Sequence, residues 1–484
     1  MAAPWNGEPL WWLQLLSLAA MAWLAQREPS WKRAALTGWT FATAWLAGTF
    51  WWLFISMHTY GGLASPLAAL AVLALAAFLA LYYAAACGAW AALARRRAMG
   101  AAWGATVFAA LWTLAELARG HWFTGFPWGA GGYAHTGGPL AGYAPWLGVY
   151  GLGAVAAWLA MGAVQVRAAG TAQRIALVVM LALPSALQGA GHASTQSTGT
   201  LRVALLQGNI PQDEKFQPGT GVPMALRWYG EHLGAAKAPL VVAPETAVPM
   251  LPQQLPAGYW DALLQRFASG QQAALVGVPL GSFEQGYTNS VIGLKPGADV
   301  YRFDKHHLVP FGEFIPPLFK WFTDLMNIPL GDFNRGDVGQ PSFEWQGQQL
   351  APNICYEDLF GEELGARFSG QTPAPTIFVN VSNIGWFGNT VAIDQHLQIS
   401  RMRALEFERP MIRATNTGAT VIIDHRGQVT HSLARHTRGV LEGEVEGRTG
   451  LTPFAWWVSR LGLWPLWGLG LLIVVADAAS GRRR

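Results

Sequence analysis

The sequence predicts a multi-span α-helical membrane domain joined to a layered α/β domain. Of the 484 residues, 52% are hydrophobic and only 12% are charged, which is typical of a membrane protein. The apolar residues are concentrated in 1–192 and again at 453–477, whereas 200–447 carries most of the charged side chains. We therefore expect a membrane domain at 1–192, a polar domain at 200–447 and a closing transmembrane helix at 453–477.

Seven stretches of the sequence are candidates for crossing a bilayer. A transmembrane helix needs about 20 predominantly apolar residues. Six candidates precede the polar domain and one follows it: roughly 9–25, 35–57, 66–94, 99–118, 146–166, 173–192 and 455–476. The first is the weakest, and the run at 66–94 is longer than a bilayer requires, which indicates tilt or a helix that continues past the interface.

Basic residues predict the orientation of these spans. The loop at 58–65, after the second span, has no Lys or Arg, whereas basic clusters follow the first, third and fifth spans and end the chain. These clusters are Arg27 with Lys32 and Arg33, Arg95–Arg97, Arg167 with Arg174, and Arg482–Arg484. Because basic loops stay in the cytoplasm, the pattern places 193–452 outside it. The clusters also explain much of the net charge of +4, so no nucleic-acid partner is expected.

The loop at 119–145 is rich in Gly, Trp, Phe and Tyr. Aromatic side chains are common at the boundary between membrane and water. An interfacial anchor is the favoured interpretation, and one wall of a lipid-binding crevice is the alternative.

The polar domain alternates short β-type runs with helical segments. The runs lie at 201–206, 240–243, 274–278, 375–380 and 419–423, and the helical segments at 224–237, 258–269 and 394–409. This alternation predicts a layered α/β domain. Functional residues in such folds usually lie on loops at strand ends.

The two cysteines have different surroundings. Cys355 lies in the polar sequence Asn-Ile-Cys-Tyr-Glu-Asp, whereas Cys87 lies in an apolar run. Two cysteines so placed imply neither a disulfide framework nor a zinc site. Cys355 is therefore the candidate for chemistry, and Cys87 for packing.

A cysteine nucleophile needs a base and a neighbouring cation that favours the thiolate. Glu245 and Lys305 lie near the ends of other predicted segments and supply a carboxylate and an ammonium. The ammonium, with the backbone N–H of Tyr356, can also stabilise an oxyanion. Taken singly, each of these residues is more often a surface, capping or packing residue.

Several motifs, in this order, resemble those of the carbon–nitrogen hydrolase (nitrilase) superfamily. They are residues 207–212, 244–249, 305–313, 354–357, 380–383 with 386–388, 403–406 and 413–416. Nearly the whole chain is more similar still to the membrane-embedded branch, the apolipoprotein N-acyltransferases. The resemblance implies an αββα sandwich for the polar domain.

The resemblance also implies roles for individual residues. Glu245 is expected to be the general base, Lys305 the oxyanion stabiliser and Cys355 the nucleophile. Glu313 is expected to support Lys305 or the attacking amine, and Tyr356 and Glu357 to lie near the nucleophile. No metal or diffusible cofactor is implied.

The implied reaction is acyl transfer at the periplasmic side of a bacterial inner membrane. The acyl chain would pass from a phospholipid, through a thioester on Cys355, to the α-amino group of a diacylglyceryl-cysteine lipoprotein. A membrane-tethered amidase that releases its acyl group to water is the alternative. A transporter or scaffold with an inactive domain is a second alternative, disfavoured because most span interiors lack charged residues.

The chain departs from the family pattern in two places. Ser382-Asn383 is followed by Ile384-Gly385 where the family usually has Asp-Ala, so no role is assigned to residue 384. The family commonly has eight spans, whereas seven are predicted here, and a start at the family's second span accounts for this.

The segment 311–345 is rich in aromatic and apolar residues. We expect a mobile arm at the membrane surface that gates acyl-chain entry. Buried packing is the alternative interpretation.

Overall fold

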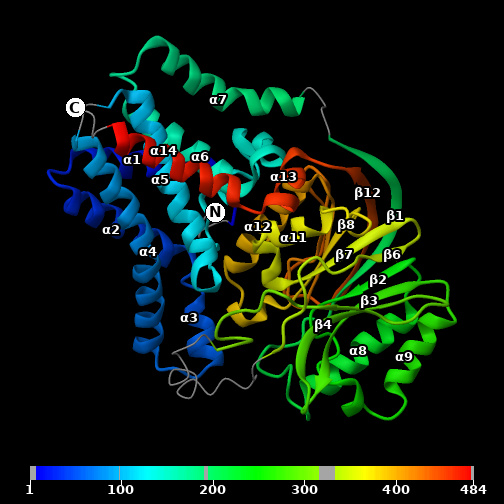
Figure 1. Cartoon of the computed structure of the whole chain (residues 1–484). Helices are drawn as coiled ribbons and strands as arrows, with labels where there is room; N and C mark the ends of the chain where they lie inside the picture. Colours follow the sequence, from blue (N-terminus) through cyan, green and yellow to red (C-terminus); the bar gives the residue numbers. More distant parts are fainter. Residues whose placement is uncertain (1–6, 97–98, 190–193, 316–332, 481–484) are drawn as a thin grey trace. The chain divides into compact units, whose positions relative to one another are not determined.

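The computed structural model describes residues 7–96, 99–189, 194–315 and 333–480. The chain forms two compact units (Figure 1). One unit comprises residues 1–54, 64–193 and 461–484, and the other comprises 55–63 and 194–460. Residues 55–63, which include the end of the span predicted at 35–57 and most of the loop after it, therefore group with the polar part of the chain.

The first unit consists of helices. Their bounds are α1 (Trp11–Arg27), α2 (Trp31–Thr49), α4 (Ser65–Arg96), α5 (Ala101–His121), α6 (Ala144–Val164), α7 (Thr171–Gly189) and α14 (Trp464–Ser480). Within the described residues, three helical stretches are long and apolar enough to cross a membrane: Ser65–Arg96, Ala101–Thr124 and Pro139–Val164. Two bent helix pairs raise this number to five if each pair is one span. The multi-span helical prediction is confirmed at this level, while α1 and the apolar part of α7, Thr171–Ala186, are shorter.

The structure breaks two of the seven predicted spans. The span predicted at 35–57 becomes α2, α3 (Leu53–Ile55) and the π-helix η1 (Ser56–Tyr60). The span predicted at 455–476 becomes α13 (Pro453–Leu461) and α14. Gly462 between them has a φ of +54°, the left-handed conformation that ends many helices. Hydropathy alone does not report such breaks, because the residues on both sides are apolar.

The aromatic-rich loop at 119–145 folds into short 3₁₀ turns held by two buried charged residues of α5. Arg119 donates hydrogen bonds to the Phe126 and Trp128 carbonyls, at 2.5 and 2.8 Å. Glu116 accepts one from the Gly131 backbone at 2.9 Å. The loop is mostly buried, although Trp122 and Phe123 are exposed.

The second unit contains two six-stranded sheets. The first has the order β12 (Gly439–Gly450), β1 (Thr195–Gln207), β2 (Leu240–Ala243), β3 (Ala273–Ser282), β4 (Gly286–Leu294), β5 (Tyr301–Asp304). The second has the order β11 (Val429–Ser432), β10 (Val421–Ile423), β9 (Met411–Thr415), β8 (Ile377–Ser382), β7 (Gln348–Ile354), β6 (Phe343–Trp345). β1 begins before the predicted run because its antiparallel ladder with β12 continues to the pair Thr195–Gly450.

Alternating side chains of β1 show why the sheets stack. Leu201, Val203 and Leu205 point into a core shared with the second sheet. Ala204 and Leu206 point the other way, into a core completed by helices. A strand with both faces buried reads as a nearly continuous apolar run, and each fully buried aliphatic side chain contributes about 1.5–3 kcal/mol.

Helices cover the outer faces of both sheets (Figure 1). α8 (Gly221–Ala235) and α9 (Tyr259–Ala268) lie on the first sheet, where Tyr229 and Phe267 are buried. α11 (Gly361–Gly365) and α12 (Ala392–Phe407) lie on the second, where Phe407 of α12 meets Phe378 of β8. The expected αββα sandwich is confirmed.

Strand direction brings several polar residues to one end of each sheet. β2 and β3 run parallel and β5 runs in the same sense, because β4 is antiparallel to both β3 and β5. In the second sheet, β7, β8 and β9 are parallel. Carboxyl ends of parallel strands are where α/β folds place their sites, and Glu245, Lys305 and Cys355 directly follow such ends.

Candidate active site

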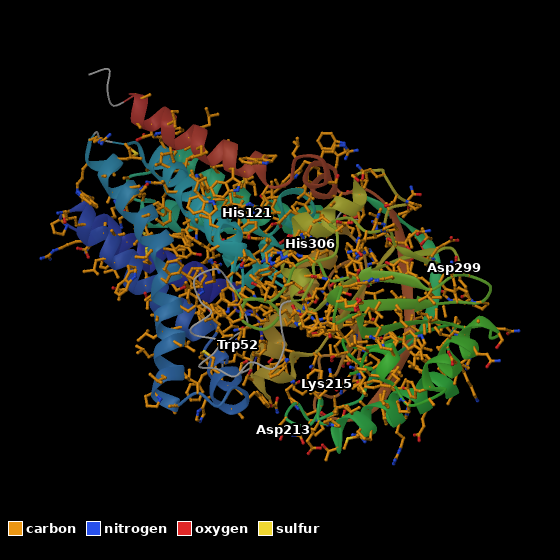
Figure 2. All side chains as sticks on the ribbon, turned by 60° about the horizontal axis from the view of Figure 1, so that its bottom comes forward. Trp52, His121, Asp213, Lys215, Asp299 and His306 are labelled. Atoms are coloured by element: carbon orange, nitrogen blue, oxygen red, sulfur yellow. The ribbon has the colours of Figure 1, made fainter. Side chains whose placement is uncertain are left out.

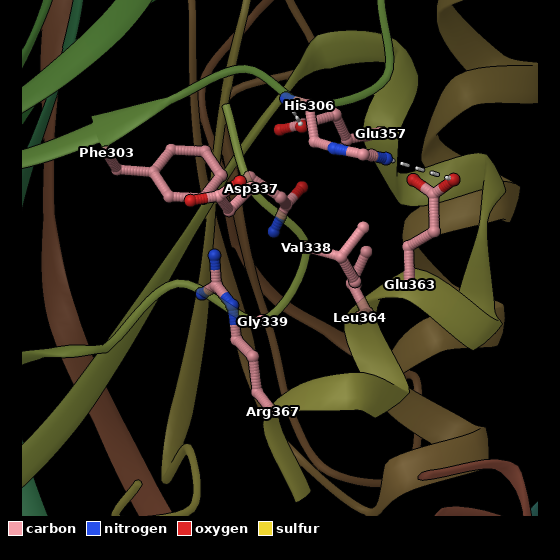
Figure 3. Close-up of a pocket in the computed structure, with 10 residues that line it drawn as sticks. Phe303, His306, Asp337, Val338, Gly339, Glu357, Glu363, Leu364 and Arg367 are labelled. Atoms are coloured by element: carbon pink, nitrogen blue, oxygen red, sulfur yellow. Dashed lines mark hydrogen bonds and ion pairs between the residues drawn. The ribbon is translucent and has the colours of Figure 1, made fainter. Parts of the chain in front are cut away.

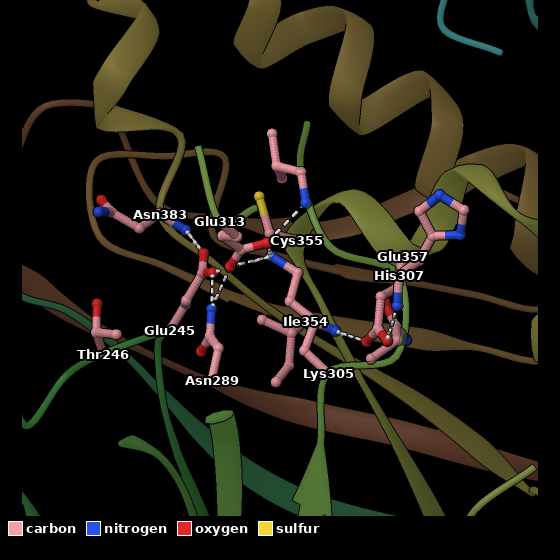
Figure 4. Close-up of polar contacts among 12 residues, drawn as sticks. Glu245, Thr246, Asn289, Lys305, His307, Glu313, Ile354, Cys355, Glu357 and Asn383 are labelled. Atoms are coloured by element: carbon pink, nitrogen blue, oxygen red, sulfur yellow. Dashed lines mark hydrogen bonds and ion pairs between the residues drawn. The ribbon is translucent and has the colours of Figure 1, made fainter. Parts of the chain in front are cut away.

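Glu245 lies on a tight turn after β2, and both of its carboxylate oxygens are hydrogen-bonded (Figure 4). The Asn289 side-chain amide donates to Oε1 at 2.7 Å, and the backbone N–H of Asn383 donates to Oε2 at 2.8 Å. Nζ of Lys305 lies 3.4 Å from Oε1. The carboxylate is therefore fixed in one orientation.

Lys305 follows β5 and pairs with two carboxylates. Its Nζ lies 2.9 Å from Glu313 and 3.4 Å from Glu245, and its side chain is 1% exposed. Asn289 also donates to Glu313 at 2.8 Å, so this one amide bridges the two carboxylates. The expectation that Glu313 supports Lys305 agrees with this geometry.

Cys355 begins the 3₁₀ helix η6 (Cys355–Leu359), directly after β7. Its φ is +51°, a left-handed conformation that costs a non-glycine residue about 1–3 kcal/mol. The surrounding structure holds it there, because His396 and Asn380 contact the Cys355 carbonyl oxygen at 3.1 and 3.3 Å. Strain of this kind is concentrated at functional sites.

The thiol of Cys355 is protonated at neutral pH. Burial and the Glu245 carboxylate raise its pKa, against the opposing charge of Lys305, to about 12. Lys305 acts in the expected direction, because it lowers the pKa of the thiol, but burial and the carboxylates outweigh it in the resting state. The main physical reason is burial of the thiol, and the carboxylates of Glu245 and Glu313, which also pair with Lys305, act in the same direction.

The base and the cation are charged at neutral pH. Burial acts to raise the pKa of Glu245, but Lys305, Asn289, Lys215 and the Asn383 N–H together hold it below its usual value. Burial acts to lower the pKa of Lys305, but Glu313 and Glu245 outweigh it and the pKa lies above its usual value. The site thus combines an ionised carboxylate, a lysine ammonium and a neutral thiol.

Glu357 joins the loop of Cys355 to the loop of Lys305. It accepts hydrogen bonds from the backbone N–H groups of Ile354 and His306, both at 2.6 Å, and of His307 at 3.3 Å. Burial raises the pKa of Glu357 to about 7, against these donors, which stabilise its carboxylate. Tyr356 is buried, with its ring 5.3 Å from the Phe360 ring centroid.

Glu357 also lines a small cavity (Figure 3). Its volume is about 30 Å³, and its lining includes Phe303, His306 and Arg367. That volume suits about one water molecule and is far too small for an acyl chain. The cavity is lined by Glu357, which joins the two loops of the site, but by neither Glu245 nor Cys355.

Two expectations concern neighbouring segments. Ile384 is buried at the start of the 3₁₀ helix η8 (Ile384–Phe387), so an apolar residue fills the position where no role was assigned. Of the predicted arm at 311–345, residues 316–332 lie outside the described part of the chain. Two residues that flank this range are hydrogen-bonded to each other: the Phe333 N–H donates to the Glu313 carbonyl at 2.9 Å.

Sequence reasoning missed three contributors to this site: Asn289, the backbone N–H of Asn383, and Lys215. Asn383 stood in a motif already noted, and Lys215 lies three residues after another. Asn289 had no signal beyond an ordinary Tyr-Thr-Asn-Ser sequence. It lies on β4, which was not predicted.

The sequence of this αββα sandwich identifies it as a carbon–nitrogen hydrolase domain. Residues 202–454 match the family described as carbon-nitrogen hydrolase. Residues 1–162 match the apolipoprotein N-acyltransferase N-terminal domain.

Relatives cover nearly the whole chain. An apolipoprotein N-acyltransferase of Verminephrobacter eiseniae is 63% identical over 96% of this chain and 90% of its own length. One of Ralstonia nicotianae is 48% identical over 98% of this chain and 90% of its own length. The chain belongs to the apolipoprotein N-acyltransferase family, and it is a membrane protein and an acyltransferase.

Proposed function

We propose that this enzyme transfers a fatty acyl chain from a membrane phospholipid to the N-terminal α-amino group of a diacylglyceryl-cysteine lipoprotein. The observation that carries the proposal is a buried, ionised Glu245 beside Lys305 and the neutral thiol of Cys355. The arrangement suits a nucleophile that is deprotonated only as it attacks. No step requires a metal or a diffusible cofactor.

In the first half-reaction, Sγ of Cys355 attacks an ester carbonyl carbon of the phospholipid while Glu245 takes the thiol proton. Lys305 and the backbone N–H of Tyr356 stabilise the oxyanion that forms. The carbon–oxygen bond of the ester then breaks, and the proton passes from Glu245 to the departing alkoxide. Lysophospholipid leaves and a thioester remains on Cys355.

In the second half-reaction, the α-amino group of the lipoprotein attacks the thioester carbonyl. Glu245 accepts a proton from the amine, the carbon–sulfur bond breaks, and the thiolate of Cys355 is reprotonated. One residue thus serves as base and then as acid in each half, which gives a ping-pong scheme. Glu313 holds Lys305, and Glu357 holds the loops of both Lys305 and Cys355.

We place the reaction on the periplasmic side of the bacterial inner membrane. The distribution of Lys and Arg among the loops supports this orientation. Hydrolysis of the thioester by water is the alternative reaction. The apolar helices of the first unit favour a lipid substrate over a small soluble amide.

Mass spectrometry of the Cys355 peptide after incubation with phospholipid tests the proposal. We expect an acyl adduct and an equivalent amount of lysophospholipid, and loss of the adduct when a diacylated lipopeptide is added. Cys355→Ala should abolish the adduct, and Glu245→Gln or Lys305→Ala should reduce its rate by at least about 10³-fold.

Cys87→Ala is the matched control, because it removes the other, buried thiol and should leave the adduct unchanged. An active Cys355→Ala enzyme would contradict the proposed mechanism. Release of free fatty acid in preference to lipopeptide acylation would instead favour the amidase alternative.

A further inference from the structure

Lys215 is a second buried lysine beside Glu245. It lies on the turn that follows the motif at 207–212, and its side chain is 1% exposed. Figure 2 labels it with Asp213 of the same turn, which is exposed and lies nearer the edge of the molecule. A fully buried lysine is rare unless it is paired, so its contacts indicate its purpose.

Two hydrogen bonds of Lys215 go to the turn that carries Glu245. Nζ of Lys215 donates to the main-chain carbonyl of Glu245 at 3.0 Å and to Oγ1 of Thr246 at 2.6 Å. Thr246 has a φ of +48°, a left-handed conformation that needs support from its surroundings. Lys215 supplies this support at Thr246, the residue next to the proposed base, Glu245.

The turn that carries Lys215 also supports Glu245 through Gln212. Oε1 of Gln212 accepts a hydrogen bond from the Asn383 side chain at 2.9 Å. The backbone N–H of Asn383 in turn donates to Oε2 of Glu245 at 2.8 Å. Residues 212–215 therefore fix both the main chain of Glu245 and one of its carboxylate oxygens.

Lys215 also balances the charge of the site. The carboxylates of Glu245 and Glu313 share one ammonium, Lys305, at 3.4 and 2.9 Å. This trio has one negative charge too many, and an uncompensated buried charge is costly. Lys215 adds the missing positive charge, and its electrostatic partners are Glu245 and Cys355.

We propose that Lys215 is a positioning residue that holds the Glu245 turn and keeps the Glu245 carboxylate ionised in both half-reactions. The inference rests on the proposed role of Glu245 as the base. Burial lowers the pKa of Lys215 to about 7, while Glu245 and Cys355 oppose this shift. Lys215 is therefore charged below neutral pH, the range in which Glu245 would otherwise take up a proton.

The test is the pH profile of acyl-adduct formation on Cys355, from about pH 4.5 to 8, in the full-length enzyme with phospholipid. In Lys215→Met, we expect the midpoint of the acidic limb to rise by about one pH unit or more, because Glu245 loses a stabilising charge. We also expect the rate at pH 7 to fall at least about tenfold. Lys215→Arg, which keeps the charge, should retain the wild-type midpoint.

Two further variants separate charge from structure. Lys237→Met removes an exposed lysine of the same unit and should change neither the rate nor the midpoint. Lys215→Gln keeps a hydrogen-bond donor without the charge and should shift the midpoint as Lys215→Met does. It decides the question if Lys215→Met does not fold.

A reduced rate with an unshifted midpoint in Lys215→Met and Lys215→Gln would overturn the inference, because a purely structural role moves only the rate. Failure of both variants to fold would overturn it as well. If Glu245→Gln stays active, the proposed function itself fails. If Glu245→Gln is inactive and the midpoints do not move, only the inference about Lys215 fails.

Discussion

At the scale of single residues, proton location controls the chemistry. Cys355 is a thiol and Glu245 a carboxylate at neutral pH. Burial acts to raise both pKa values, and it prevails at Cys355, whereas Lys305, Asn289, Lys215 and the Asn383 N–H outweigh it at Glu245. A nucleophile stored in this form is protected from stray electrophiles and oxidants, since the thiolate is the reactive species. In the proposed mechanism, reaction then depends on a substrate that brings its carbonyl carbon within reach while Glu245 takes the proton.

The first prediction follows from the pKa of Cys355. Alkylation of Cys355 by iodoacetamide should be slow at pH 7 and should rise steadily up to about pH 10, because the thiol pKa is about 12. The measurement is the rate of carbamidomethylation by mass spectrometry in a Cys87→Ala background. A rate that reaches a plateau below pH 8 would show a thiolate in the resting enzyme and contradict the prediction.

The sequence predicted the residues that do chemistry better than those that hold them. Glu245, Lys305 and Cys355 stand in recognisable motifs, and the structure places Glu245 and Lys305 3.4 Å apart. Lys215 and Asn289 act through contacts with residues that are 30 and 44 positions distant in the chain. Such contacts exist only after the sheets have formed, so local sequence patterns cannot report them.

At the scale of elements, one buried polar network holds the nucleophile loop to α12 and β9. Asp358 of η6 accepts hydrogen bonds from His396 and Ser400 of α12. Arg413 of β9 donates to the His396 carbonyl and to Ser400. His396 also contacts the Cys355 carbonyl oxygen, so the network fixes the backbone of the nucleophile.

The second prediction concerns this network. Arg413→Met should lower the free energy of unfolding by about 3–5 kcal/mol, because it removes the buried donor to the His396 carbonyl and Ser400 together with the positive charge that interacts with Asp358. The control, Arg435→Met, breaks an ion pair with Asp394 in which the arginine side chain is 41% exposed, and it should cost about 0–1 kcal/mol. Parallel thermal unfolding in detergent measures both, and equal shifts would contradict the assignment.

The predicted elements succeed where hydrophobic pattern dominates. The helical segments at 224–237, 258–269 and 394–409 correspond to α8, α9 and α12. Several strands had no apolar run to reveal them. β7 contains Pro352 and Asn353, β5 has four residues, and β12 alternates Glu442, Glu444 and Glu446 with uncharged residues. Pairing with neighbouring strands, a tertiary effect, decides these cases.

At the scale of the whole molecule, the boundary between the two units is not a single point in the sequence. Residues 55–63 belong to the unit that carries the site. There, Tyr60 of η1 stacks edge-on against Trp386 of η8, with ring centroids 5.8 Å apart. η8 follows Asn383 directly, so a segment between two predicted spans supports the loop that binds Glu245.

The third prediction tests orientation in the membrane. In a background without Cys87 and Cys355, Asp299→Cys should react with an impermeant maleimide added to intact spheroplasts. Lys32→Cys should react only after lysis, because basic loops remain in the cytoplasm. Both positions are exposed, so accessibility within the fold is matched. Labelling of Lys32→Cys before lysis would contradict the proposed topology and indicate the opposite orientation.

Glu245 and Lys305 extend from one sheet of the sandwich, and Cys355 extends from the other. The separation of base and nucleophile is therefore set by the thickness of the side-chain layer that includes Val242, Ile354 and Val379. Stacked sheets lie about 10 Å apart, and a volume change of one methylene is felt in such a layer. A change of side-chain volume at these interior positions therefore affects both the stability of the sandwich and the spacing of Glu245 and Cys355.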